Sequence, residues 1–575
     1  ATHRHPCPTL LLRPFRTKQN DHIMRNKIVL TLFAVLMVIT VSAQPAATQK
    51  AAKAVFSLTT FNAAGDIIAS AHGTFVSSQG EAIAPWKPFV GAARAVVIDA
   101  TGTEHPVVAM IGANELYDVC KFTIEHSTPT VSLAPQAATK TAWLLPYSVQ
   151  KAKPLPLTIQ RIEQFSERFN YYVFNPSTLS AQQVGCPVVN AQGQLCGLLQ
   201  TTSDGTFTAV DARFASEMQA NSLALSNATL RTCAIRPALP ASLDDATVAL
   251  LMSANLTDSL THQSLIDAFI QQFPTAKEGY TNKALSLVDA GKDEEAEKVM
   301  QTALEKVERK DEAYSEYAKV ILQKQIHYPN RAFAPWSLDK ALQAAEKAAT
   351  IQPLPQYIHQ QAQIYYAKQD YQKACDLFMQ LTHTPLRSGE LFYEASQCKR
   401  MLRAPITEAL ALLDSAVAVC PRPLNSIAST YLLARGATYQ EMGQYRLAVK
   451  DYNTYDSIAQ GPSRYRDFYY QRYQCELKIK QFQQALNDLA RTILLNPEEP
   501  VYYAEMASLC LRVKRNEDAE QAALRCTEIA TDYADGFLLL GIARQELGKP
   551  EEARKALLRA KELGDKRADE YLKRK

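Results

Sequence analysis

The strongest constraint on the fold is an internal repeat in the second half of the chain. Alanine recurs there at spacings of 33 to 45 residues, and each copy lies in a similar frame of aromatic and small residues. The recurring positions are Ala296, Ala341, Ala374, Ala409, Ala448, Ala485, Ala519 and Ala553. Two antiparallel helices approach closely only where a small residue meets the partner, and aromatic side chains then fill the space between neighbouring pairs. The sequence therefore predicts an α-solenoid of about eight helix pairs over residues 270–575.

The last copy shows the frame most fully. In "ADGFLLLGIARQELGKPEEARKALLRAKELGD", Phe537 precedes Gly541 on a first helix, Gly548 marks the turn, and Ala553 lies on a second helix. This frame, with a period of about 34 residues, resembles the tetratricopeptide repeat (TPR). The resemblance implies a superhelix with a concave face that binds a protein or a peptide. The 45-residue interval indicates an insertion near residues 327–336.

Residues 50–222 have a different texture. Short runs of alternating apolar and polar residues are broken by Gly, Asn and Asp roughly every 8–12 positions, a pattern typical of an all-β sandwich or barrel. Residues 223–269 contain "RPALPAS", which predicts a linker, and then a helix with Ser242 and Asp245 in capping-box spacing. The fold class predicted is therefore multidomain, with β structure first and helices second.

Three stretches of the β-rich part occur in the order found in one enzyme family. They are "AHGTFVSSQGEAIAPWKP" (71–88), "YDVCKFTIE" (117–125) and "QVGCPVVNAQGQLCGLL" (183–199). Their glycine and hydrophobic skeleton resembles that of the trypsin-like, chymotrypsin-fold serine peptidases. The resemblance implies a double β-barrel over residues 50–222 that leads into the TPR solenoid.

The same resemblance places the catalytic slots on residues that lack the chemistry. The histidine slot falls on Lys87, the serine slot on Val184 and the oxyanion-loop glycine slot on Gln182, while Asp118 fits the aspartate slot. Hydrolysis by this family needs a nucleophile, a base and an orienting carboxylate. Val184 has no nucleophilic atom and Lys87 is a poor base at neutral pH, so we expect a barrel without protease activity, with Asp118 solvated or paired with Lys87.

A changed nucleophile is the alternative. Cys186 lies two residues after the serine slot, and a cysteine with a base can carry out acyl transfer. Neither His72, His105 nor His126 stands at a family position. Cys186 and Cys196 are instead expected across a hairpin, as buried thiols or as a disulfide.

The first 43 residues resemble a targeting segment. Residues 24–43 read as a secretory signal peptide, with a basic start, an apolar run and a small-residue cleavage site, and residues 1–23 are expected to be a mis-called or removed extension. The remaining chain has 56 basic and 57 acidic residues, which does not favour nucleic acid as a partner. Its cysteines show no metal spacing, so no metal or cofactor is predicted. We expect export to the periplasm or cell envelope, without a stable transmembrane anchor.

Two groups in the helical half are candidate partner-binding residues. "RYRDFYYQRY" (464–473) is rich in Arg and Tyr, residue types enriched at binding hot spots, and it predicts that Tyr470, Arg472 and Gln474 contact a partner while Tyr469 packs. His359, Gln363 and Tyr366 share one face of an earlier first helix. Packing between repeats is the competing interpretation of both groups.

The sequence thus predicts an exported, non-catalytic protein-binding scaffold. The TPR groove is expected to hold a protein or peptide, with the protease-like barrel as a second interaction module. A hydrolase with non-standard residues in the barrel cleft is the alternative function.

Overall fold

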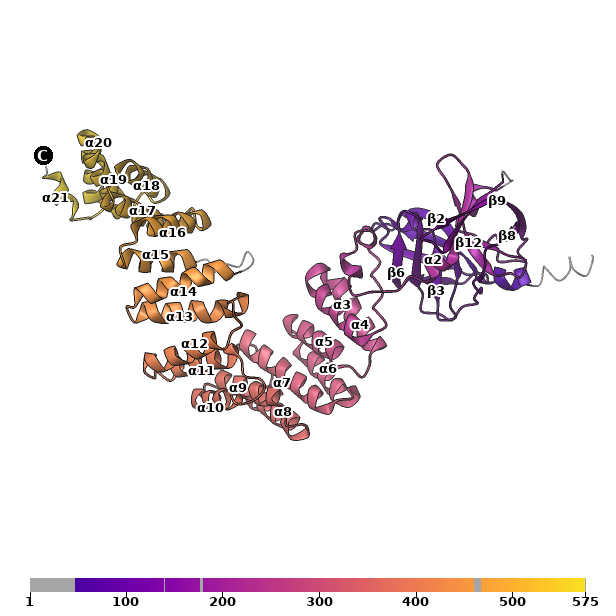
Figure 1. The fold of residues 1–575 in the computed structure, drawn as a ribbon, viewed down its shortest axis with the longest axis horizontal. Coiled ribbons are helices and arrows are strands. Elements are labelled where there is room, and N and C mark those ends of the chain that lie inside the picture. Colours follow the sequence, from indigo (N-terminus) through magenta and orange to yellow (C-terminus); the bar gives the residue numbers. More distant parts are fainter. Residues whose placement is uncertain (1–46, 139, 176–178, 460–466, 574–575) are drawn as a thin grey trace, which may run out of the picture. The chain divides into compact units, whose positions relative to one another are not determined.

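A computed structural model describes residues 47–138, 140–175, 179–459 and 467–573. The chain divides into two compact units, Ala1–Ala290 with Glu295–Val299, and Gly291–Glu294 with Met300–Lys575 (Figure 1). The predicted signal peptide and the preceding extension lie outside the described residues.

The first unit opens with a seven-stranded antiparallel sheet in the order β5-β4-β1-β2-β3-β7-β6. Three phenylalanine rings pack together on it. The ring centroid of Phe56 lies 4.7 Å from that of Phe75 and 5.9 Å from that of Phe122. The strands are β1 (Val55–Phe61), β2 (Ile67–Phe75), β3 (Glu81–Ala84), β4 (Arg94–Ile98), β5 (Glu104–Pro106), β6 (Ala109–Asn114) and β7 (Val119–Thr123). The alternating pattern of the sequence places these aromatic rings on the buried face.

A closed barrel follows, in the order β10-β13-β12-β11-β8-β9. Its strands are β8 (Thr141–Leu144), β9 (Leu155–Phe165), β10 (Phe169–Phe174), β11 (Pro187–Val189), β12 (Leu195–Thr201) and β13 (Phe207–Asp211). β11 and β12 form the expected hairpin, in which Val189 pairs with Leu195 around a turn that holds Gly193 at φ +72°. The prediction of β structure before the helices is therefore confirmed, in the form of one seven-stranded sheet and one closed barrel.

Residues 223–237, predicted as a linker, lie instead against the seven-stranded sheet. Gly91 N donates to Thr232 O at 2.7 Å, and Met110 N donates to Arg236 O at 2.9 Å. Cys233 and Ile235 are buried in the core of the sheet. The prolines of "RPALPAS" suggested a free connection, but the sheet buries these apolar side chains and donates hydrogen bonds to the carbonyl groups of the segment, so the prediction of a linker is wrong here.

Three helices complete the first unit: α3 (Leu243–Leu256), α4 (Ser259–Gln272) and α5 (Lys277–Asp289). α3 begins as predicted, because Ser242 caps it. Asp245 N donates to Ser242 Oγ at 3.2 Å, and that hydroxyl donates to the Asp245 carboxylate at 2.8 Å.

The eight recurring alanines occupy one structural position. Each is the fourth residue of a second helix and is almost fully buried. These helices are α6 (Asp293–Lys306), α8 (Leu338–Ile351), α10 (Tyr371–Leu381), α12 (Ile406–Ala418), α14 (Tyr445–Ile458), α16 (Phe482–Leu495), α18 (Asn516–Ile529) and α20 (Pro550–Glu562). The first helices of the second unit are α7 (Lys310–His327), α9 (Pro355–Ala367), α11 (Gly389–Met401), α13 (Ser429–Glu441), α15 (Phe468–Lys478), α17 (Pro500–Arg512) and α19 (Ala534–Glu546).

Close helix contact explains the small residues of the frame. A Cβ atom at Gly541 on α19 would lie 2.5 Å from Leu557 Cγ and 3.3 Å from Ala553 O on α20. The first helix of the last pair can therefore approach the second only without a side chain at this position. Successive pairs then stack through the second unit (Figure 1).

Candidate functional site

The barrel pocket brings two of the predicted catalytic slots together. Lys87 N donates to Asp118 Oδ1 at 2.7 Å, and Lys87 Nζ lies 3.9 Å from Asp118 Oδ2. Buried Trp86 and Phe89 hold the turn that carries Lys87. Asp118 has φ +47°, which is unusual for a residue with a side chain and marks a constrained turn. The ion pair expected from the sequence is present, on a lysine side chain that is 77% exposed.

The serine slot lies in a different environment. Val184 follows the short 3-10 helix Ala181–Gln183, and His72 N donates to Val184 O at 3.2 Å. Gly185 is at φ +85°, and a Cβ there would lie 2.0 Å from His72 O, so only glycine fits. Gln182 is exposed. Among the described residues, the pocket of about 460 Å³ that holds Lys87 and Asp118 is lined by neither Val184 nor Gln182.

The structure also bears on the cysteine alternative. His72 abuts the loop that carries Cys186, a proximity that no motif in the sequence indicates. Burial raises the pKa of the Cys186 thiol to about 12 and lowers the pKa of His72. Both shifts favour neutral side chains, whereas a cysteine nucleophile requires a thiolate. Cys186 and Cys196 are free, buried thiols.

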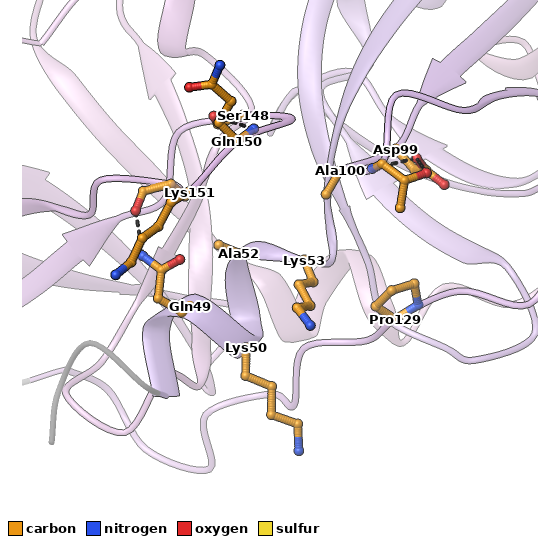
Figure 2. A pocket seen from close by; sticks show the side chains of 12 residues that line it. Gln49, Lys50, Ala52, Lys53, Asp99, Ala100, Pro129, Ser148, Gln150 and Lys151 are labelled. Carbon is orange, nitrogen blue, oxygen red and sulfur yellow. Dashed lines mark hydrogen bonds between the residues drawn. The ribbon is translucent and has the colours of Figure 1, made fainter.

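A second pocket of the first unit carries several lysines. It has a volume of about 800 Å³ and lies between residues 49–53, 99–101, Pro129 and 148–152. Figure 2 shows Lys50, Lys53 and Lys151 around it, while Asp99 is turned toward its own loop. Burial alone would raise the pKa of the Asp99 carboxyl. Hydrogen bonds from Thr101, His105 and Thr103 have the larger opposite effect and lower this pKa to about 2. No sequence signal marks this pocket, because its lining comes from four segments that lie far apart in the sequence.

In the helical unit, the predicted group on α9 forms a pocket with α11. His359 Nε2 lies 2.6 Å from Glu394 Oε2, and Gln363 Nε2 donates to Glu394 Oε1 at 2.9 Å. A pocket of about 580 Å³ opens beside them, lined by Tyr366 and by the half-exposed side chain of Ile326 on α7. Burial opposes the charge of His359, but the hydrogen bond to Glu394 and the charges of Glu394 and Glu390 raise its pKa.

The sequence of a single repeat does not mark Glu394 as a pocket residue. It lies 35 positions after His359, which is about one repeat period, on the next first helix. Comparing equivalent positions in successive repeats would have found this partner, because side chains one period apart face one another across stacked first helices.

The second predicted group separates into packing and surface residues. Phe468, Tyr469 and Tyr473 are buried. Tyr470 is half-buried and its ring lies 5.0 Å from that of Tyr502 on α17, while Gln474 is exposed. Residues 464–466 of this stretch lie outside the described part of the chain.

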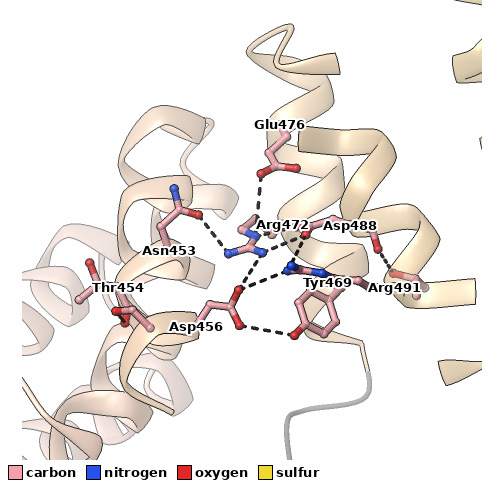
Figure 3. Close-up of polar contacts among 10 residues, drawn as sticks. Asn453, Thr454, Asp456, Tyr469, Arg472, Glu476, Asp488 and Arg491 are labelled. Atoms are coloured by element: carbon pink, nitrogen blue, oxygen red, sulfur yellow. Dashed lines mark hydrogen bonds and ion pairs between the residues drawn. The ribbon is translucent and has the colours of Figure 1, made fainter. Parts of the chain in front are cut away.

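Arg472 is not a surface residue, so its assignment to a partner contact is wrong. Its Nε donates to Asp488 Oδ2 at 2.6 Å, and its other nitrogens donate to Asn453 and Asp456 at 3.0 Å and 3.1 Å (Figure 3). Its side chain is only 7% exposed. A buried guanidinium is retained where carboxylates satisfy it, and the acidic residues that do so come from neighbouring helices α14 and α16.

Glu476 completes this network at 3.9 Å from Arg472 Nε. Its Oε2 is buried without a hydrogen-bond partner. Burial and the charge of Asp488 raise the pKa of Glu476 to about 8, although Arg472 and Arg491 offset part of the effect. Burial therefore favours the protonated form of this carboxyl.

Within residues 47–573, leaving out the undescribed gaps, no group of three His, Cys, Asp or Glu side chains could hold a metal ion. No helix of that part of the chain is both long and apolar enough to span a membrane.

Comparison with known proteins gives partial matches. No protein-family model matches the sequence. The small glutamine-rich tetratricopeptide repeat-containing protein 2 of Saccharomyces cerevisiae is 30% identical over 95 residues, which are 16% of this chain and 28% of that protein. The TPR repeat-containing thioredoxin TDX of Arabidopsis thaliana is 35% identical over 72 residues, 12% of this chain and 19% of that protein.

The crystal structure of the MamA protein matches with a TM-score of 0.27 and 19% identity, over 32% of this chain and 94% of that chain. The chain thus spans less than a third of the length of the curated relatives. The repeat frame, the helix pairs that it forms and the TPR-containing relatives together support tetratricopeptide repeats in the helical half of this chain.

Proposed function

We propose that this chain is a non-catalytic protein-binding scaffold whose helical repeats hold a protein or peptide partner. The observation that carries the proposal is the pocket beside His359, Gln363 and Tyr366. It has about 580 Å³ of space, and residues of three successive first helices, α7, α9 and α11, line it together with α10. Such a surface, built from equivalent positions of stacked repeats, suits an extended or helical segment of a partner. The TPR-containing relatives support the same role.

The barrel, in this proposal, is a trypsin-like pseudoprotease that serves as a second interaction module. Support comes from Val184 in the serine slot and from Lys87, which is paired with Asp118. An ammonium held by a carboxylate is a poor general base. A hydrolase with non-standard residues remains the alternative function, and the raised pKa of Cys186 argues against it.

Export to the periplasm or cell envelope is part of the proposal and rests on the sequence of residues 24–43 alone. Those residues lie outside the described part of the chain.

Affinity capture tests the groove assignment. The full chain and its Tyr366→Ala variant are immobilised and exposed to an extract of the source cells, with Gln372→Ala on the exposed face of α10 as the matched control. We expect the wild-type and control chains to retain the same protein, and Tyr366→Ala to lose it while its circular dichroism and melting temperature remain close to wild type. Retention of the same protein by Tyr366→Ala overturns the groove assignment.

A further inference from the structure

Carboxylates and tyrosines alternate along the first helices next to the proposed groove. Tyr393 on α11 and Tyr431 on α13 have ring centroids 5.8 Å apart. Burial, and then the nearby charge of Glu390, raises the pKa of Tyr431 to about 12, with Glu394 adding to the effect. Glu390 and Glu394 lie on α11 together with Tyr393, so carboxylates and an aromatic ring share this helix.

The same combination recurs on α15 and α17. Tyr470 lies with its ring 5.0 Å from that of Tyr502 and 5.6 Å from that of Tyr473, and Tyr473 OH donates to Glu505 Oε2 at 2.6 Å. Burial and the charge of Glu505 raise the pKa of Tyr470. This second place also combines tyrosine rings with a carboxylate.

Three basic residues of these first helices pair with carboxylates of second helices, and Arg400 on α11 pairs with Glu441 on α13. Lys399 Nζ lies 2.9 Å from Glu408 on α12. Arg435 contacts Asp414 on α12 and Asp451 on α14, and Arg472 contacts Asp488 on α16. The described residues that line the pocket include no lysine or arginine, and Glu394 is their single carboxylate. The pocket therefore presents tyrosine rings to a partner, together with one carboxylate that His359 and Gln363 also contact.

We propose that the groove selects a basic peptide segment, in which an arginine or lysine stands next to an apolar side chain. This inference rests on the proposed function and names the chemistry of its partner. A cation over a tyrosine ring and beside a carboxylate gains both a cation–π and an ionic contact. The apolar neighbour fits against Leu322, Ile326 and Phe378, which line the pocket. Charge complementarity of this kind mainly sets partner selection and the rate of association.

Two pools of short random peptides test the inference. Both contain a fixed leucine, with arginine beside it in one pool and glutamate in the other, and binding to the full chain is measured by fluorescence anisotropy at low and high salt. We expect the arginine pool to bind about 10-fold more tightly, with a loss of that preference at high salt.

Charge removal gives the matched variants. Glu390→Gln with Glu394→Gln should weaken binding of the arginine pool about 5–10-fold, whereas Asp376→Asn, an exposed acid on α10, should leave it unchanged. The single variant Glu390→Gln keeps the contact between His359 and Glu394. If the double variant misfolds, this single variant should still weaken binding of the arginine pool in part. Preferential binding of the glutamate pool, or equal binding of both, overturns the basic-partner inference. The scaffold function stands or falls separately, on the affinity capture with Tyr366→Ala.

Discussion

Glu476 lies among charges that balance only when its own carboxyl is neutral. Arg472 and Arg491 supply two cations, and Asp456 and Asp488 supply two anions within ion-pair distance of them (Figure 3). An ionised Glu476 adds a buried negative charge that its 3.9 Å contact with Arg472 does not offset, because that guanidinium is already bound by other carboxylates.

The folded state therefore binds the Glu476 proton more tightly than the unfolded chain does. A carboxyl whose pKa rises from its ordinary value to about 8 on folding contributes stability at low pH, and this contribution is lost as the pH rises toward 8. We expect Glu476→Gln to match wild type near pH 5 and to be more stable near pH 8, by about 1–3 kcal/mol in chemical denaturation. Equal pH dependence in both chains would show that Glu476 is ionised in the folded state. Glu517→Gln, in the first turn of α18, serves as the control.

Adjacent tyrosines on α15 should differ in their effect on stability. Tyr469 is 5% exposed and packs between repeats, whereas Tyr470 is half-buried at the surface. Tyr469→Ala is expected to cost about 3–5 kcal/mol in unfolding free energy, and Tyr470→Ala about 1 kcal/mol or less. Thermal and chemical denaturation of both variants provide the check. A loss with Tyr470→Ala as large as that with Tyr469→Ala would place Tyr470 in the core.

The close pairing of α19 with α20 depends on the lack of a side chain at Gly541. Because a Cβ at Gly541 would lie 2.5 Å from Leu557 Cγ, Gly541→Ala should force α19 away from α20 and destabilise the last repeats by about 1–3 kcal/mol, although alanine has the higher helix propensity. Glu546→Ala on the exposed side of α19 should change stability by no more than about 0.5 kcal/mol. Stabilisation by Gly541→Ala in denaturant titrations would mean that α19 and α20 are not in close contact there.

The repeats were predictable from sequence because one small residue recurs at one structural position. Ala485 and Ala553, for instance, each occupy the fourth position of a second helix. Ile235 and Arg472 were not predictable in the same way. Their burial depends on partners far away in the sequence, the seven-stranded sheet for Ile235 and acidic residues of two other helices for Arg472, and local composition carries no record of those contacts. Lys87 and Asp118 were found because the resemblance to a peptidase family aligned them.

At the scale of the whole chain, the proposal of a pseudoprotease domain leads to a chemical prediction. With valine in the serine slot and the Cys186 pKa raised to about 12, we expect the full chain to hydrolyse neither peptides nor esters and to leave a fluorophosphonate probe unreacted. Trypsin under the same conditions is the positive control. Stoichiometric labelling of the barrel would establish a nucleophile and favour the hydrolase alternative.

The two compact units should also unfold separately. The three tryptophans divide between them, with Trp86 and Trp143 in the first unit and Trp336 in the second. In the Trp336→Phe variant, tryptophan fluorescence reports only the first unit, while far-UV circular dichroism weighs mainly the helices of the second. We expect the two signals to give different denaturant midpoints. Superimposable curves would indicate a single cooperative unit.

Because the thiols are buried, the rate at which each cysteine is alkylated reports how often the structure around it opens. All ten cysteines in the described part of the chain are buried and free, four of them in the first unit and six in the second. An alkylating reagent reaches a buried thiol only when the surrounding structure opens, so the order in which these sulfurs are modified records the order in which parts of the protein open. The same shielding protects these ten thiols from disulfide exchange with other proteins, since attack on a partner requires an accessible thiolate.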